Sequence, residues 1–243
     1  MNRIQRQNRW LKLAGSIVLF LGVAVVLMGQ AKPLSPVRSQ KEIRAGAFIL
    51  EDGEGKTRAW LAMSPEGPAL ALADAKGTGR VGLSLSDGSS GLTLYDADGK
   101  GRVGLSLSDG SPGLTLYGPN GKRRMTVVTL ADGSPVLRMY DKEETRRAEL
   151  SVKANGATQL DLKDQKGVRR AWLTVGANDL PGLGLLDKGG RHRAWLTIEP
   201  NGLPSLFLFG LTQKPRAVMG VRPDDTPVLR MLDKDGNFIW QAP

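Results

Sequence analysis

The sequence predicts an all-β protein built from tandem repeats and preceded by one transmembrane helix. Three observations support the β prediction: 31 glycines among 243 residues, stretches that alternate aliphatic with small or polar residues, and an internal repeat. So much glycine disfavours a mainly helical chain, while 40% hydrophobic residues are too many for a disordered one. The decapeptide Arg-Val-Gly-Leu-Ser-Leu-Ser-Asp-Gly-Ser begins at Arg80 and recurs unchanged at Arg102, and this interval sets the period of the repeat.

Residues 1–31 predict a basic cytoplasmic stub and a membrane anchor. The segment from Leu13 to Gly29 contains no charge, and Trp10 and four cations precede it: Arg3, Arg6, Arg9 and Lys12. Its length reaches the short end of what a spanning helix needs and exceeds most signal-peptide cores. The small residues of Gly29-Gln30-Ala31 leave a cleaved signal peptide as the alternative. By the positive-inside rule we expect a single-pass membrane protein whose later residues are periplasmic or extracellular.

Two further regions follow the anchor. Residues 32–43 contain two prolines and four charged side chains, and they predict a short linker. Residues 44–243 form the repeat domain, in which each copy follows the pattern Leu-x-Leu-x-Asp-x-x-Gly-x-x-Arg-Ala-x-Leu.

The repeat is marked by arginines at regular intervals, and the interval grows by one residue after Arg124. Each arginine follows an aspartate or glycine by six residues, and Asp233 opens a ninth copy without an arginine. The extra residue therefore falls in only one of the two turns of each repeat. The arginines are Arg58, Arg80, Arg102, Arg124, Arg147, Arg170, Arg193 and Arg216.

Each repeat contains two short strands with one aliphatic and one small or polar face. A two-residue type I′ turn at Asp98-Gly99 sets Leu94 opposite Val103 and Leu92 opposite Leu105, so that aliphatic side chains meet. The same register sets Tyr95 opposite Arg102.

We therefore predict nine tandem two-strand repeats with a period of about 22–23 residues, forming an antiparallel hairpin meander. The alternative is a parallel β-solenoid with one coil per repeat, which would stack the arginines in a repulsive ladder about 4.8 Å apart. About 18 strands exceed what stays open and flat, so we expect the sheet to curl, fold onto itself or close, and thereby bury its leucines.

The segment Tyr95-Asp96-Ala97-Asp98-Gly99-Lys100 resembles the Tyr-Asp repeats, the YD or Rhs type, of bacterial secreted shells. The whole plan also resembles uncharacterised bacterial membrane-anchored β-hairpin repeat proteins. The resemblance covers residues 44–243 as a pattern only, since only Tyr95 and Tyr140 precede a turn aspartate. It implies a hairpin repeat architecture and no catalytic residue.

The residues that usually perform catalysis or bind metals are scarce. The chain has no cysteine and one histidine, which excludes disulfide scaffolds, cysteine nucleophiles and nearly all structural zinc sites. The Asp96-x-Asp98-Gly99 turn begins like a calcium loop but lacks the later bidentate glutamate. His192 lies between two arginines, which predicts a solvated turn residue. We expect no enzyme, no cofactor, no metal and no nucleic-acid partner.

The polar face of the repeats becomes aromatic late in the chain. Large apolar residues gather there, whereas earlier repeats have serine, threonine and glycine. The transferred register sets Trp195 opposite Phe209 and Trp172 opposite Leu186. Such a patch predicts a docking surface for a partner subunit or a second copy, while burial by the sheet itself is the alternative. The predicted partner-binding residues are Trp172, Leu186, Trp195, Phe207 and Phe209.

Two functions fit these features. The first is a non-catalytic, membrane-anchored extracytoplasmic scaffold or accessory subunit of a larger membrane or envelope assembly. The second is a binding module for envelope glycans or other polymers, using tyrosine, tryptophan and arginine side chains. The first is favoured because a repeat protein that binds a polymer is expected to repeat its contact residue, and Trp60, Trp172 and Trp195 recur irregularly.

Overall fold

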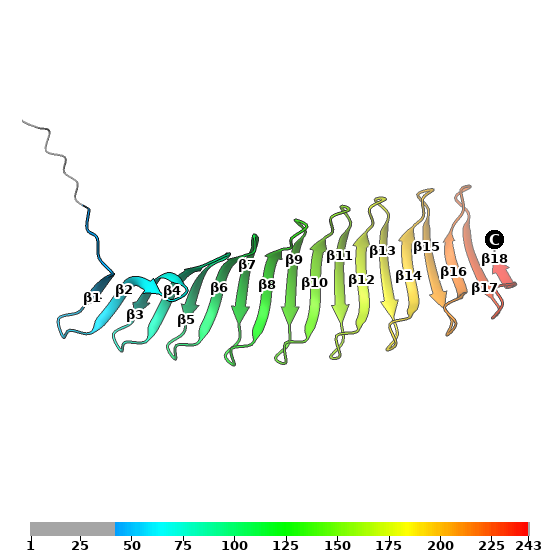
Figure 1. The fold of residues 1–243 in the computed structure, drawn as a ribbon. Helices are drawn as coiled ribbons and strands as arrows, with labels where there is room; N and C mark the ends of the chain where they lie inside the picture. Colours follow the sequence, from blue (N-terminus) through cyan, green and yellow to red (C-terminus); the bar gives the residue numbers. More distant parts are fainter. Residues whose placement is uncertain (1–41, 243) are drawn as a thin grey trace, which may run out of the picture. The chain divides into compact units, whose positions relative to one another are not determined.

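The computed structural model describes residues 42–242, in which the regular secondary structure consists of eighteen β-strands in one sheet. Each strand pairs antiparallel with its neighbours in sequence (Figure 1). The all-β hairpin meander is therefore confirmed, and the parallel solenoid is wrong. The strands are β1 (Ala47–Glu51), β2 (Thr57–Ser64), β3 (Gly67–Ala73), β4 (Gly79–Ser86), β5 (Ser89–Tyr95), β6 (Gly101–Ser108), β7 (Ser111–Tyr117), β8 (Arg123–Thr129), β9 (Pro135–Tyr140), β10 (Arg146–Val152), β11 (Thr158–Lys163), β12 (Arg169–Val175), β13 (Pro181–Leu186), β14 (His192–Ile198), β15 (Pro204–Phe209), β16 (Pro215–Val221), β17 (Pro227–Leu232) and β18 (Phe238–Ala242).

The turns after odd-numbered strands form one edge of the sheet, which we call the aspartate edge. Each spans five residues, as between Asp96 and Lys100, where the Asp96 N–H donates to the Lys100 carbonyl oxygen at 2.9 Å. The Asp96 carboxylate accepts the N–H groups of Asp98 and Lys100 at 3.0 and 2.9 Å. Gly99 has a φ of 73°, which glycine adopts without strain. The result is a type I turn closed by a glycine bulge, and the predicted two-residue type I′ turn is wrong here.

The predicted register between β5 and β6 is confirmed up to the bulge. Leu94 pairs with Val103, and Leu92 pairs with Leu105. Beyond Leu94 the register shifts by one residue, so Tyr95 pairs with Gly101 and the predicted pairing of Tyr95 with Arg102 is wrong.

The turns at the opposite edge explain why the period lengthens by one residue in the later repeats. The first ones are two-residue turns, and Asp109-Gly110, with φ values of 48° and 77°, is of type I′. From β8 onward they span five residues, as where the Glu199 N–H donates to the Leu203 carbonyl oxygen at 2.8 Å. The prediction that one turn has a fixed length and the other takes the extra residue is confirmed.

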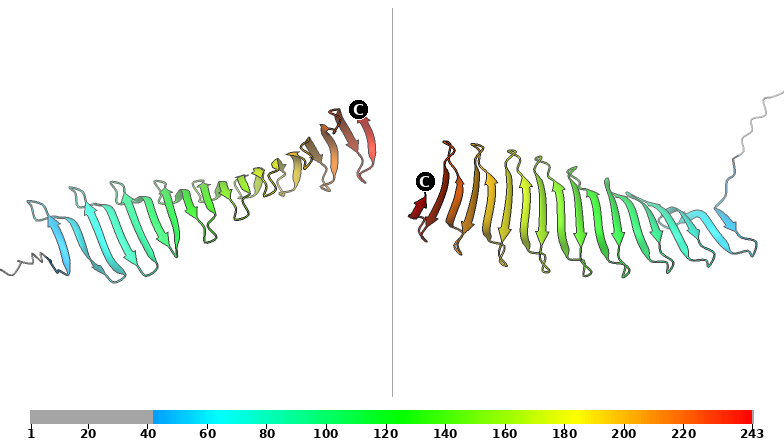
Figure 2. Two further views of the ribbon diagram at one scale, coloured as in Figure 1. Left: turned by 90° about the horizontal axis from the view of Figure 1, so that it is seen from above. Right: turned by 180° about the vertical axis from the view of Figure 1, so that it is seen from behind.

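The sheet is a single open layer, so the prediction that it curls or closes is wrong for residues 42–242. β1 pairs with β2 and β18 pairs with β17, each at an outer edge of the sheet. Turns of two to five residues place each strand beside the preceding one, and none is long enough to start a second layer. The sheet instead twists along its length (Figure 2), as the preferred twist of strands requires.

The predicted anchor, Leu13 to Gly29, lies outside the described residues, as does nearly all of the predicted linker. Among residues 42–242, no helix has the length and apolar character needed to cross a membrane.

Candidate interaction surfaces

One face of the sheet, the aliphatic face, carries two continuous rows of apolar side chains. In the first row each residue stands directly opposite the next across the strand pairs, from β1 to β18, and no polar residue interrupts it. This unbroken row follows from the exact repeat of the Leu-x-Leu pattern, because side chains alternate between faces along each strand. The first row comprises Phe48, Leu61, Leu70, Leu83, Leu92, Leu105, Leu114, Val127, Leu137, Leu150, Leu160, Leu173, Leu183, Leu196, Leu206, Met219, Leu229 and Ala242.

The second row runs beside the first and alternates in size from strand to strand. Every odd-numbered strand contributes leucine or methionine, and most even-numbered strands contribute alanine or valine. The exceptions are Met125 on β8 and Trp240 on β18. In strand order the row comprises Leu50, Ala59, Leu72, Val81, Leu94, Val103, Leu116, Met125, Met139, Ala148, Leu162, Ala171, Leu185, Ala194, Leu208, Ala217, Met231 and Trp240.

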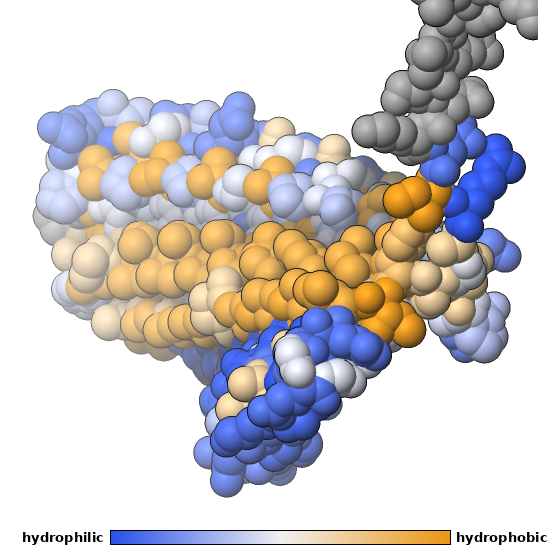
Figure 3. Space-filling view, turned by 90° about the vertical axis from the view of Figure 1, so that its left-hand side faces the viewer, coloured by the Kyte–Doolittle hydropathy of each residue, from blue (hydrophilic) through white to orange (hydrophobic). Residues whose placement is uncertain are grey.

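The aliphatic face is exposed within the single chain. Leu105, Leu150 and Leu173 have exposed fractions of 48%, 50% and 52%. Seen along the sheet, the apolar side chains form continuous bands over successive strands (Figure 3). The sequence correctly predicted which residues share this face, but the prediction that the protein itself buries them is wrong. An apolar surface of this extent marks an interaction site in soluble proteins.

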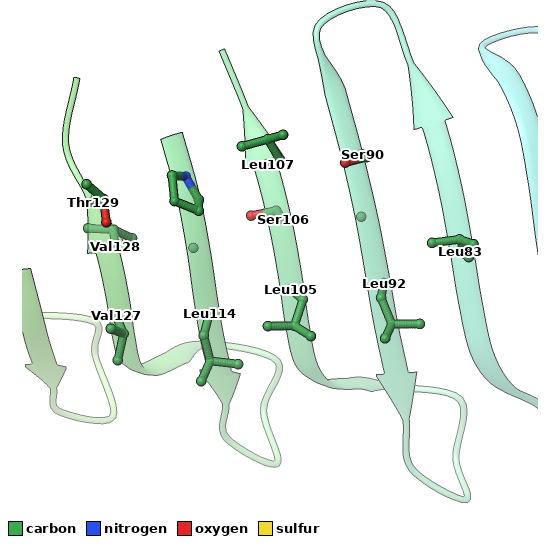
Figure 4. A pocket seen from close by; sticks show the side chains of 13 residues that line it. Leu83, Ser90, Leu92, Leu105, Ser106, Leu107, Leu114, Val127, Val128 and Thr129 are labelled. Carbon is green, nitrogen blue, oxygen red and sulfur yellow. The ribbon is translucent and has the colours of Figure 1, made fainter. Parts of the chain in front are cut away.

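A shallow groove of about 480 Å³ lies on the aliphatic face between β4 and β8. Leu83, Leu92, Leu105, Leu114 and Val127 line it as one row, with one residue from each strand (Figure 4). The groove continues the exposed face and is mainly apolar, with Ser90 and Thr129 among its lining residues, which suits another apolar surface better than a polar small molecule.

The repeated arginines lie along the aspartate edge, and six of the eight donate to a backbone carbonyl oxygen of the next repeat. Arg147 lies 3.4 Å from the carboxylate of Asp141 in its own turn and donates from Nε to the carbonyl oxygen of Lys163 in the next repeat, at 3.0 Å. Arg193 makes the equivalent contacts with Asp187 and the carbonyl oxygen of Gly210. These arginines therefore stabilise the sheet itself. This agrees with the sequence, in which an aspartate precedes most of them by six residues.

Six of the aspartates that begin these turns have lowered pKa values. Backbone N–H groups of Arg191 and Gly189, with the Arg193 guanidinium, hold the pKa of Asp187 well below its ordinary value of 3.8, against the opposing effect of burial. Backbone donation from Lys56 likewise lowers the pKa of Asp52. These carboxylates thus accept hydrogen bonds within their own turns and stabilise them.

A charged cluster that the sequence did not reveal lies on the face opposite the aliphatic face. Arg138 donates from Nε to the Glu149 carboxylate at 2.8 Å, and Arg146 pairs with the same carboxylate. Burial raises the pKa of Glu149, but the hydrogen bond from Arg138 and the charge of Arg146 outweigh it, so the net pKa is lowered. The partners come from β9 and β10, and only the strand register places them together.

The predicted aromatic residues also gather on this opposite face, where they form an aromatic cluster. Trp195 lies 5.9 Å from Phe207 between ring centroids, Phe207 lies 6.2 Å from Phe209, and Trp172 lies 6.5 Å from Trp195. Leu186, the remaining predicted residue, is buried, with 8% exposed. The structure therefore places the predicted set on one face, where Leu186 pairs with His192 of the neighbouring strand.

The predicted pairings within the aromatic cluster are wrong. Trp195 pairs with Phe207 rather than Phe209, and Trp172 pairs with Gly184 rather than Leu186. In both pairs, the two strands are connected by a turn at the edge opposite the aspartate edge. The geometry of these turns differs from that of the Asp98-Gly99 turn, which was used to set the register.

Glycines on β13 make room for the two indoles. A Cβ atom on Gly184 would overlap the Trp172 indole, and one on Gly182 would lie 3.0 Å from Trp195 Nε1. The tryptophans therefore pack against the glycine backbone of their own sheet. Trp195 still has 36% of its surface exposed.

His192 belongs to the same cluster, and its predicted place as a solvated turn residue is wrong. It begins β14, is half-buried, and lies 6.0 Å from Trp172 and 6.3 Å from Phe209 between ring centroids. Its Nδ1 atom is buried with no hydrogen-bond partner among residues 42–242. One feature of the sequence could have indicated this position. His192 lies two residues before the Ala-Trp-Leu motif, at the start of a strand.

A second groove, of about 390 Å³, lies beside the aromatic cluster at the opposite edge. Trp172 and Trp195 line it together with Asn178, Glu199 and Pro200. Aromatic rings beside amide and carboxylate groups are a suitable lining for a sugar ring or a short peptide.

Comparisons with known proteins give weak structural similarities. No model of a known protein family matches the chain. No curated protein matches it either. A point mutant of the TCP10 domain of Danio rerio CPAP aligns with 13% identity over 80% of this chain and 98% of that one, with a TM-score of 0.35. The wild-type domain aligns with 13% identity over 75% and 98%, with a TM-score of 0.30.

A third solved structure is the TCP domain of Drosophila melanogaster SAS-4 (dCPAP) in complex with a proline-rich motif of Ana2 (dSTIL). It aligns with 11% identity over 82% of this chain and 97% of that one, with a TM-score of 0.29. Similarity at this level identifies neither a family nor a function for this chain.

Proposed function

We propose that the chain is a non-catalytic, membrane-anchored scaffold or accessory subunit whose β-repeat sheet binds protein through its aliphatic face. One observation is central: two rows of apolar residues run without a polar interruption across all eighteen strands, and many of their side chains are about half exposed. Leucines left in water at this density represent a large unfavourable surface, because each fully buried leucine gains roughly 1.5–3 kcal/mol.

The membrane and extracytoplasmic parts of the proposal rest on the sequence. Leu13 to Gly29 has the length and flanking charges of an anchor, and the repeat domain follows after a short linker. An anchored sheet would be held close to the membrane assembly that it serves.

Photo-crosslinking in intact membranes tests the proposal. A photoreactive amino acid at Leu83, on the aliphatic face of β4, is expected to give adducts with protein. The matched control is Ser84, the next residue, which points to the opposite face and is exposed. Equal adduct formation at both positions, or none at Leu83, contradicts the proposed function.

Binding of envelope glycans is a second candidate, and the groove beside Trp172 and Trp195 favours it. Titration of the full chain with soluble envelope oligosaccharides, followed by tryptophan fluorescence, tests this candidate. A Trp195→Ser variant is expected to abolish any fluorescence change that reports binding in the groove. An unchanged response in that variant excludes this groove as the binding site.

A further inference from the structure

We propose that the occupant of the aliphatic face is the same face of a second copy of this chain, giving a two-layer β-sandwich. The copies are related by a twofold axis that runs parallel to the strands, between β9 and β10. This inference rests on the proposed function, because it names the protein that covers the face.

The size of the face fits a stable homodimer. Eighteen strands about 4.8 Å apart extend over roughly 80 Å, and two rows of side chains cover a band more than about 10 Å wide. Each copy would therefore contribute on the order of 1,000 Å², or about 2,000 Å² in total, which is the range of obligate homodimers. Neither row contains a charged residue, and obligate interfaces are depleted of charge at their centre.

The alternation of large and small residues in the second row matches a second copy of the same row. Two facing layers pack best when large side chains of one enter the space above small side chains of the other. A row that alternates with the strand number has this complementarity to itself, provided that odd-numbered strands face even-numbered strands.

The proposed axis meets this condition over the whole sheet. It places β9 opposite β10, β7 opposite β12, and β1 opposite β18. Each odd-numbered strand therefore lies opposite an even-numbered strand of the other copy. Every alanine of the second row that lies within β2 to β16 then faces a leucine or methionine of the other copy. The facing pairs are Ala59 with Met231, Ala148 with Met139, Ala171 with Leu116, Ala194 with Leu94, and Ala217 with Leu72.

The twist of the sheet is compatible with this packing. Rotation about an axis parallel to the strands preserves the sense of twist, so the two layers turn together along their length. Twisted sheets pack in this aligned way, about 10 Å apart, with their strands within roughly 30° of each other.

The absence of cysteine from the chain allows a direct test by thiol crosslinking. In the full chain in its membrane, Leu150→Cys on β10 lies close to the axis, so treatment with a short bismaleimide is expected to give a band at twice the chain mass. Ser151→Cys is the matched control, because it is the next residue on the same strand and points to the opposite face. It is expected to stay monomeric.

A second pair of variants tests the axis. Leu83 on β4 and Leu206 on β15 lie opposite each other across the proposed dimer. Chains with Leu83→Cys alone or Leu206→Cys alone are expected not to crosslink, because each thiol is many strands away from the same thiol of the other copy. Co-expression of the two variants is expected to restore the dimer band.

The outcomes separate this inference from the proposed function. An adduct of Leu150→Cys with a protein of a different mass overturns the second copy but leaves the scaffold proposal in place. Crosslinking of Leu83→Cys alone as efficiently as Leu150→Cys indicates non-specific association and overturns the twofold arrangement. If Leu150→Cys gives no protein adduct and Leu83 gives none by photo-crosslinking, both proposals fail, and lipid becomes the remaining occupant.

Discussion

Arg216 donates a hydrogen bond of 2.6 Å from Nη1 to the backbone carbonyl oxygen of Asp233, which begins the next turn of the aspartate edge. Its own turn begins with Gly210 instead of aspartate, so Arg216 has no carboxylate partner there. The arginine nevertheless keeps the contact to the next repeat. We infer that joining successive repeats is the role of the six arginines that make this contact, and that the ion pair is an addition to it.

Removing one of these arginines should therefore loosen the next turn. Arg216→Met deletes a charge-assisted hydrogen bond, for which a loss of about 1.5 to 3 kcal/mol is expected. Amide exchange at Gly236, in the turn that Arg216 contacts, measures the effect locally. Lys234→Met is the control, because within residues 42–242 the Lys234 side chain pairs only with Asp235, and it is 82% exposed. It should change stability by less than about 0.5 kcal/mol. An equal effect of the two variants would contradict the role of Arg216 in joining the repeats.

The aspartate edge should lose protection in acid. Because the pKa of Asp187 is lower in the folded protein than its ordinary value of 3.8, the unfolded state takes up protons first. The stabilisation is therefore complete above about pH 4 and is lost as the pH falls further. Protection of the Gly190 amide should fall in that window.

The chain provides its own control for this pH dependence. The turn from Gly118 to Lys122 has the same backbone hydrogen bonds but begins with glycine. The protection factor of the Gly121 amide should therefore depend much less on acid than that of Gly190. Parallel losses at the two turns would show that the aspartate carboxylate is not the cause.

The glycines under the indoles should not tolerate a side chain. Gly184→Ala forces Trp172 out of its position, and overpacking of this kind costs about 1 to 3 kcal/mol. Tryptophan fluorescence should shift to longer wavelength as the indole becomes more exposed. Gly104→Ala is the control, since its Cβ would lie 3.6 Å from the Tyr117 ring, an ordinary contact. If Gly184→Ala is as stable as Gly104→Ala, the packing of Trp172 on the glycine is wrong.

The aromatic cluster stays a predicted docking surface, and a double variant tests it. Trp195→Ser with Phe209→Thr introduces residue types found on the polar face of earlier repeats. If the cluster binds a partner, association should weaken by several kcal/mol while folding is retained. A loss of about 2 to 5 kcal/mol of stability in the isolated chain, like that of Leu196→Ala, would instead show internal packing.

The sequence was sufficient to predict the strands and their pairing in the first repeats. Leu94 pairs with Val103 as predicted, because a shift of one residue would move every leucine to the other face. The turn type was missed because the Asp96 carboxylate captures two N–H groups of its own turn. These side-chain hydrogen bonds favour a turn in which only the glycine has a positive φ. The Asp-Gly dipeptide alone does not reveal them.

The candidate surfaces were predicted only in part. The sequence identified the aromatic residues but assigned the aliphatic rows to an internal core. A Leu-x-Leu pattern shows that side chains share a face; it does not show what covers that face. The contact between Glu149 and Arg138 depends on the register of two separate strands. The contact between His192 and Trp172 likewise depends on how their strands are placed in the sheet.

The most direct test of the account is whether the aliphatic face is covered in the assembled protein. Leu105→Cys and Ser106→Cys occupy adjacent positions of β6, both exposed in the single chain, on the aliphatic and the opposite face respectively. In intact membranes, a water-soluble maleimide should label Ser106→Cys readily and leave Leu105→Cys protected until the protein is denatured. Equal labelling of the two thiols in the native membrane would contradict the claim that this face is an interaction surface.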